Sequence, residues 1–176
     1  MPEMSDILQE AVKLEQDGGA YYRNAAEKAS NPLAQHTFNH LAEMEEEHEK
    51  LLRAYCDAVE ESGTCPAPEE MDAREYNLLE EAQDIFQKAT EEMEQSAGAT
   101  ENLLELYDGA MEFERQSIEM YQKQADVAEI EEQRELFEYL VTQEKKHLKL
   151  LENGQRFLDN PEGEWWVEAE QWSVTG

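Results

Sequence analysis

Residues that break helices are scarce in this sequence. Only 8 glycines and 5 prolines occur among 176 residues, whereas glutamate, leucine, alanine and glutamine are abundant. The abundant residues have high helix propensities, so the composition predicts helix along most of the chain. The length allows one domain with a substantial core and hardly two.

Cysteine is scarce as well, and the two cysteines are not placed as a metal-binding pair. Cys56 and Cys65 are separated by eight residues, so they form no CxxC motif. This spacing excludes a zinc ribbon, a rubredoxin-type iron site and a thioredoxin motif built within the chain. We expect both cysteines to be free thiols in a reducing cytosol.

Long apolar runs and a secretory signal are also lacking. No run is long enough to span a bilayer, and residues 1–6 lack the basic and apolar regions of a signal peptide. We therefore expect a cytoplasmic protein that does not enter a membrane.

Positive charge is the remaining deficit. Lysine and arginine total 14 against 43 aspartates and glutamates, which gives a formal net charge of −29 at pH 7. This charge repels nucleic acid and anionic membrane surfaces, so neither is an expected partner. Aromatic residues make up 9% of the chain and the apolar residues are periodic, so we do not expect a disordered acidic chain.

What the chain does contain is an internal repeat. Residues 11–52 align without a gap to residues 110–151 when 99 is added to each number, and about twelve of roughly 42 positions are identical. Two copies are too few for a solenoid. The repeat therefore favours a symmetric bundle built from two helical hairpins.

Each repeat unit is predicted to form two helices. Ser5 and Asp6 are suited to cap the first helix of the chain. Asn31 and Pro32 mark the start of the second, with Asn31 as the N-cap and Pro32 at the first helical position. Thr100 is suited to cap the first helix of the second unit.

The two units are joined by a long connection, residues 63–99, whose second half is amphipathic. Apolar residues spaced by threes and fours between Tyr76 and Met93 predict an additional helix there. A long connection lets the third bundle helix run parallel to the second, which is the single-crossover topology of ferritin-like bundles.

The sequence therefore predicts an all-α, ferritin-like four-helix bundle over residues 1–158. Residues 159–176 form a tail that is rich in tryptophan. We expect Trp165, Trp166 and Trp172 to pack on the surface of the bundle.

Polar residues interrupt the apolar face of the second helix in each unit. Glu45 and His48 share one helical face with Phe38, Leu41 and Leu52. The same pattern recurs 99 residues later around Glu144 and His147, and Glu15 and Glu114 lie amid apolar neighbours thirty residues before each Glu-x-x-His. Because an unpaired buried carboxylate is costly, these six residues need a common explanation.

A dinuclear metal site provides that explanation. Two divalent ions would balance the charges of four carboxylates, and carboxylate oxygens and imidazole nitrogens are suitable ligands for iron. One Glu on each of two helices plus Glu-x-x-His on each of the other two is the di-iron carboxylate pattern of this architecture. The predicted ligands are therefore Glu15, Glu45, His48, Glu114, Glu144 and His147.

Three alternatives stay open for these residues. Manganese could replace iron at one or both positions, because carboxylate-rich sites accept it. A single Glu-x-x-His motif in so acidic a helix is not evidence of a metal site. For the two motifs together, the competing interpretation is a bundle that has lost its metal. Tyr22 and Tyr121, two turns after Glu15 and Glu114, could hydrogen-bond the ligands, supply an electron or simply fill the core.

The stretches that carry these residues resemble the rubrerythrin family of the ferritin-like superfamily. They are EAVKLEQDGGAYYRNAA, HLAEMEEEHEKLL, GAMEFERQSIEMYQKQA and YLVTQEKKHLKLL. The resemblance implies two iron ions that are bridged by Glu45 and Glu144, with Glu15, His48, Glu114 and His147 as terminal ligands. It also implies reduction of peroxide at this centre or, as in ferritins, oxidation of ferrous iron.

The sequence departs from that family in two respects. Full rubrerythrins carry a rubredoxin-like domain that supplies electrons, and its absence here implies an external electron donor. Family members often have a further Glu three residues after the ligand on the third helix, where this chain has Ser117, and Gly18 is the counterpart in the first unit.

We therefore expect a di-iron oxidoreductase that reduces peroxide or oxygen and forms a homodimer. A ferroxidase or iron-storage protein is the alternative, and a non-catalytic bundle that binds a partner is the second alternative. His36 and His40 have no histidine counterparts in the second unit, and we expect them to be solvated.

Overall fold

The computed structural model describes residues 4–71, 73, 77–93 and 101–160, and all regular structure in these residues is helical. The all-α prediction is therefore confirmed. The elements in chain order are α1 (Met4–Lys28), α2 (Pro32–Ser62), the short 3₁₀ helix η1 (Pro68–Met71), α3 (Leu78–Met93), α4 (Glu101–Val127) and α5 (Glu131–Asp159).

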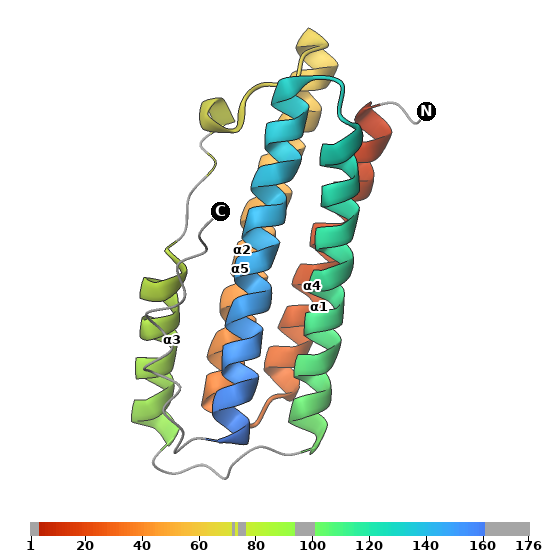
Figure 1. The fold of residues 1–176 in the computed structure, drawn as a ribbon. Helices are drawn as coiled ribbons and strands as arrows, with labels where there is room; N and C mark the ends of the chain where they lie inside the picture. Colours follow the sequence, from red (N-terminus) through yellow and green to blue (C-terminus); the bar gives the residue numbers. More distant parts are fainter. Residues whose placement is uncertain (1–3, 72, 74–76, 94–100, 161–176) are drawn as a thin grey trace.

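Four long helices form the bundle, and they pair as two antiparallel hairpins (Figure 1). α1 packs mainly on α2 and α4 mainly on α5, while α1 meets α4 and α2 meets α5 across the bundle. α2 and α4 run in the same direction, because the chain descends along α3 before α4 begins. This is the predicted ferritin-like topology with a single long crossover.

Local sequence signals explain the start and the end of α2. The Oδ1 atom of Asn31 accepts hydrogen bonds from the backbone N–H groups of Leu33 at 2.9 Å and Ala34 at 3.4 Å, and Pro32 is the first helical residue. Gly63 ends the helix with a φ of 71°, a left-handed conformation that glycine adopts without steric cost. The start at Asn31 and Pro32 was predicted from the sequence, and the end at Gly63 agrees with the predicted start of the connection at residue 63.

The capping prediction for α1 is wrong. The helix begins at Met4, so Ser5 and Asp6 lie inside its first turn and not before it. Asp6 still favours the helix there, because a carboxylate near the N-terminus interacts well with the helix dipole. Thr100, the cap predicted for α4, lies outside the described residues.

The helix predicted within the crossover is confirmed as α3, although Tyr76 lies outside the described residues. Its buried side chains, which pack against α2 and α5, are Leu78, Ala82, Ile85, Phe86 and Ala89. Phe86 contacts Phe157 of α5 edge to face, with ring centroids 5.6 Å apart. The tryptophans of the tail also lie outside the described residues, so their packing and the domain boundary at 158 stay predictions.

The core consists of two apolar clusters, and the repeat in the sequence is also a repeat in packing. In one cluster Tyr22 stacks on Phe38, with centroids 6.2 Å apart and an interplanar angle of 20°. In the other, Tyr121 stacks on Phe137 at 6.1 Å and 26°. Within the described part of the chain, no helix has the length and the apolar character needed to cross a membrane.

Candidate metal centre

The six residues predicted as metal ligands lie together inside the bundle. Each bundle helix contributes: α1 through Glu15, α2 through Glu45 and His48, α4 through Glu114, and α5 through Glu144 and His147. All six side chains are buried. In both Glu-x-x-His motifs the spacing of three places the two side chains on one helical face, which here is the inner face.

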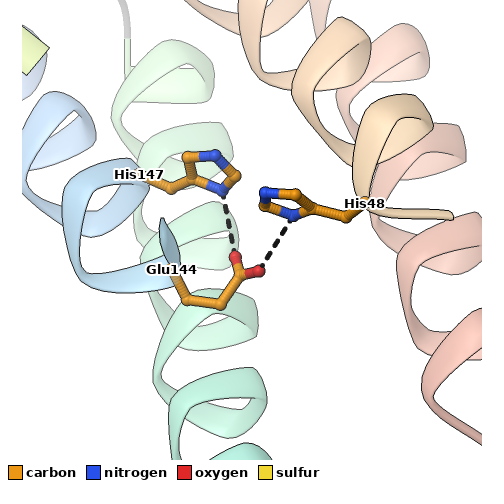
Figure 2. Close-up of side chains that lie close together, drawn as sticks. All are labelled: His48, Glu144 and His147. Carbon is orange, nitrogen blue, oxygen red and sulfur yellow. Dashed lines mark hydrogen bonds and ion pairs between the residues drawn. The ribbon is translucent and has the colours of Figure 1, made fainter. Parts of the chain in front are cut away.

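The carboxylate of Glu144 contacts both imidazole rings, one through each oxygen (Figure 2). Its Oε2 atom is 3.0 Å from Nδ1 of His147, and its Oε1 atom is 3.2 Å from Nδ1 of His48. The rings are nearly parallel, with centroids 5.3 Å apart and an interplanar angle of 18°. One carboxylate from α5 therefore contacts a histidine from each repeat unit.

The remaining carboxylates surround the same two nitrogens. Nδ1 of His48 is 3.3 Å from Oε2 of Glu15. Nδ1 of His147 is 3.2 Å from Oε1 of Glu45 and 3.6 Å from Oε1 of Glu114. Both imidazoles thus turn Nδ1 towards the centre of the cluster.

These side chains form three overlapping groups whose ligand atoms lie within 4.8 Å of one another, and the smallest contains His48, Glu144 and His147. Of the two larger groups, the first contains Glu15, Glu45, His48 and Glu144, and the second contains Glu45, Glu114, Glu144 and His147. Glu45 and Glu144 belong to both groups, whereas each group has its own histidine and its own glutamate from α1 or α4. Such sharing is what two adjacent cations bridged by two carboxylates would need.

Tyr22 and Tyr121 donate hydrogen bonds to glutamates of the opposite repeat unit. The hydroxyl of Tyr22 donates to Oε1 of Glu114, and the hydroxyl of Tyr121 donates to Oε1 of Glu15. The spacing in the sequence had placed each tyrosine on the same face as the glutamate of its own unit. The structure shows that the hydrogen bonds run between the two hairpins.

Burial and mutual repulsion raise the pKa of two carboxyl groups. Burial, then the charge of Glu144, raises the pKa of Glu114 to about 8. The same two causes raise the pKa of Glu45 well above its usual value. Burial opposes ionisation of Glu144 too, but the charges of His147 and His48 outweigh it and lower the pKa of this carboxyl.

The histidines show the complementary effect. Burial by itself would lower the pKa of His48, but hydrogen bonds to Glu144 and Glu15 raise it to about 9. The pKa of His147 is raised well above its usual value because Glu144 and Glu114 outweigh the effect of burial. The raised pKa values of the imidazoles, like those of Glu45 and Glu114, favour proton binding and so reduce the net negative charge of the cluster.

The donor atoms fit a metal. Among the described residues, the buried Oε2 atom of Glu114 has neither a hydrogen-bond nor an ion-pair partner, and Oε1 of Glu45 and Oε1 of Glu144 have only their ion-pair contacts with the imidazoles. An unpartnered buried carboxylate oxygen is costly unless a cation or another donor satisfies it. A set of carboxylates and imidazoles suits iron and manganese. The cluster can therefore hold a metal ion.

Sequence reasoning did not identify the role of Gly18 beside this cluster. A Cβ atom at Gly18 would lie 2.8 Å from Cε1 of Phe113 and 3.4 Å from the carboxyl carbon of Glu45. α1 can therefore approach α4 and the cluster only because residue 18 has no side chain. The adjacent glycines in the middle of a predicted helix were the signal, since glycine there costs stability unless a close approach requires it.

Ser117, which stands where the resemblance would place a further glutamate, does not face the cluster as a ligand. Its hydroxyl donates to the carbonyl oxygen of Phe113 at 3.2 Å, one turn earlier in α4. Ser117 therefore satisfies its own helix backbone, and the carboxylates of the cluster are the four that the repeat identified.

Comparison with known proteins assigns the chain to a family. No curated protein and no solved structure matches the chain significantly. A family model described as Rubrerythrin matches residues 6–154, which include both repeat units, the crossover and every residue of the cluster. The chain therefore belongs to the rubrerythrin family, whose members are di-iron carboxylate proteins.

Proposed function

We propose that this protein is a di-iron oxidoreductase that reduces peroxide at the buried cluster. In this proposal Glu15, Glu45, His48 and Glu144 would hold one iron ion, and Glu45, Glu114, Glu144 and His147 would hold the other. When bound, the iron pair supplies the two electrons that the reduction of peroxide consumes.

The observation that supports the proposal most is the sharing of Glu45 and Glu144 by two otherwise separate groups of donors. A single buried Glu–His pair would be explained by an ion pair. Two groups with identical composition, overlapping in two carboxylates and drawn from four helices, exceed what charge pairing needs. Membership of the chain in the rubrerythrin family agrees with this interpretation.

The side chains around the cluster would fix its geometry and keep it dry. Tyr22 and Tyr121 each donate to one carboxylate oxygen, so the second oxygen of Glu114 and of Glu15 is the one that would remain for a metal. Burial, then the charge of a nearby glutamate, raises the pKa of both tyrosines, so their hydroxyls stay protonated and remain donors at neutral pH. The apolar clusters on both sides exclude bulk water.

Two partners belong to the same proposal. Sustained turnover would require an electron donor outside this bundle, because Cys56 and Cys65 form no CxxC pair for a rubredoxin-type site. We also propose that the chain acts as a homodimer with two irons in each bundle.

The test begins with metal analysis of protein purified without oxygen, and about two irons per chain are expected. The reduced protein is then mixed rapidly with equimolar hydrogen peroxide or with oxygen, and its absorbance is followed. Oxidation by peroxide should be the faster of the two. Equal rates, together with uptake of many irons per chain into a hollow assembly, would instead establish a ferroxidase or storage protein.

A protein that cannot be loaded with iron or manganese would contradict both interpretations. The non-catalytic bundle would then be the remaining function. Glu144→Gln is the matched variant for loading, because it keeps the shape of the side chain and removes the charge that both groups share.

A further inference from the structure

A second group of histidines and carboxylates lies on the outside of the bundle, between α2 and α3. It surrounds a surface cavity of about 200 Å³. α2 contributes His36, His40 and Glu43 to its lining, and α3 contributes Glu81 and Asp84. None of these residues belongs to the central cluster, and no three of their donor atoms lie within 4.8 Å of one another in the described structure. A bound ion would therefore have to draw these surface side chains together.

Both histidines reach across to α3. Nε2 of His40 lies 3.1 Å from Oε2 of Glu81, and these two side chains are only 23% and 22% exposed. Nε2 of His36 lies 3.1 Å from Oε1 of Glu92. Residues four apart share one helical face, so the two imidazoles point to the same side of α2. His40 is therefore not simply solvated, contrary to the expectation from the sequence, whereas the contact of His36 lies on an exposed surface.

The repeat shows that the bundle itself does not require these histidines. Their counterparts in the second unit are Glu135 and Tyr139, at positions where α5 occupies the place of α2. The core residues of the two units remain equivalent even though these two positions differ. The histidines therefore serve the contact between α2 and the crossover helix α3.

We propose that this cavity is a second metal site, which binds one divalent transition-metal ion and clips α3 to α2. His36, His40 and Glu81 are the principal ligands, and Asp84 and Glu43 supply further carboxylate oxygens. Two imidazoles at a spacing of four on one helix are a known arrangement for holding a divalent metal. Imidazole and carboxylate together suit zinc, cobalt, manganese and ferrous iron.

Lys88 is the built-in competitor for this ion. Its Nζ atom lies 2.6 Å from Oδ2 of Asp84, and the side chains of both residues are more than half exposed. The ammonium group therefore occupies one carboxylate that the metal would use. Since the lysine is exposed and flexible, the ion displaces it at a modest cost that a neutral residue would remove.

The site would couple metal binding to the docking of the crossover helix. The ligands come from two helices, so the bound state requires α3 to stay on α2, and binding stabilises that arrangement by mass action. Iron chemistry at the central cluster does not enter this inference, and its test is independent of the proposed peroxide reduction.

Titration of the full chain with Co²⁺ tests the site, because the visible spectrum of cobalt reports its ligands. The double variant His36→Gln/His40→Gln should bind one ion fewer per chain than the wild type. Ions bound at the unchanged central cluster are the same in both proteins and do not affect this difference. Glu81→Gln should weaken the outer site about tenfold or more. Glu60→Gln removes the same charge from an exposed position of α2 and should leave the affinity unchanged.

Lys88→Met provides a test in the opposite direction, since it should tighten Co²⁺ binding at the outer site. Hydrogen exchange of residues 78–93 should slow on addition of the metal in the wild type and stay the same in His36→Gln/His40→Gln. Unchanged stoichiometry in the double variant would overturn the proposal. Equal weakening by Glu60→Gln and Glu81→Gln would also overturn it, because binding would then reflect only the net charge.

Discussion

Gly18 and Gly19 are neighbours in one helix, yet replacement by alanine should change stability in opposite directions. In a helix interior, glycine is less favourable than alanine by about 0.5–1 kcal/mol, so each replacement gains that amount before any contact is considered. The contacts that the new methyl group makes then decide the sign. α1 therefore contains its own matched control.

At Gly18 the new Cβ would lie 2.8 Å and 3.2 Å from two ring atoms of Phe113, and 3.4 Å from the carboxyl carbon of Glu45. Phe113 is stacked on Tyr21, with centroids 6.4 Å apart, so its ring cannot withdraw without disturbing that pair. Overpacking of this kind costs about 1–3 kcal/mol. The cost exceeds the gain in helix propensity, and Gly18→Ala should be destabilising.

At Gly19 the nearest atoms are Nη2 of Arg23 at 3.3 Å and Cβ of Glu45 at 3.5 Å. The second distance is an ordinary van der Waals contact. The first involves the end of a long side chain that is 49% exposed and can move. Gly19→Ala should therefore keep most of the gain in helix propensity and be stabilising.

The assay is thermal and chemical unfolding of the metal-free protein, followed by circular dichroism. The two variants should differ by about 1–3 kcal/mol, and each 1 kcal/mol corresponds to roughly 2–4 °C in Tm for a chain of this size. Gly18→Ala should melt below the wild type and Gly19→Ala above it. If both variants shift Tm by the same amount in the same direction, the close approach of α1 to α4 at Gly18 is not what the structure describes.

Three further predictions concern the centre and the buried hydroxyls. Glu144→Gln should lower the metal content at both positions, whereas His48→Gln should lower it mainly at one. Elemental analysis would measure both losses, and equal losses in the two variants would contradict the proposed bridging role of Glu144. Tyr22→Phe removes a hydrogen-bond donor to a buried carboxylate and should lower the free energy of unfolding of the metal-free protein by about 1–3 kcal/mol. Urea unfolding would measure this loss beside that of the matched variant Tyr121→Phe. No loss in either variant would contradict the hydrogen bonds between the two hairpins. Burial raises the pKa of Tyr107 above its usual value and that of Cys65 to about 11, so the unfolded chain loses these protons first and stability should fall as the pH rises above about 9. A Tm that stays constant from pH 8 to about 11 would refute the last expectation.

The architecture and the clustering of the six residues could be predicted from the sequence because both patterns occur twice in the chain. The gapless repeat identified the hairpins, and the duplicated Glu-x-x-His separated Glu45 and Glu144 from a background of surface glutamates. Asn31 and Gly63 have strong local conformational preferences, so the ends of α2 were also predictable. In each case the information lies within one helix or in the comparison of two equivalent segments.

Contacts between elements could not be predicted in the same way. Which glutamate Tyr22 meets depends on how the hairpins cross, and periodicity within one helix says nothing about that. The pairing of His40 with Glu81 depends on where the crossover helix packs on α2. The two residues are 41 positions apart, so local sequence patterns do not determine this packing. The start of α1 was misplaced because Ser5 and Asp6 are equally acceptable before a helix and in its first turn.

The exchange of contacts between the two hairpins has a consequence for how such a chain can diverge. Each group of donors draws on both units, so a lone hairpin of this kind would complete its site only by pairing with an identical copy, and every substitution would then occur in both halves. Joining the halves through the crossover removes that constraint. The first unit has Tyr21 where the second has Met120, and His40 where the second has Tyr139. A symmetric pair of identical hairpins could not have these differences. The fused chain keeps the shared centre symmetric while each outer face is free to acquire features of its own.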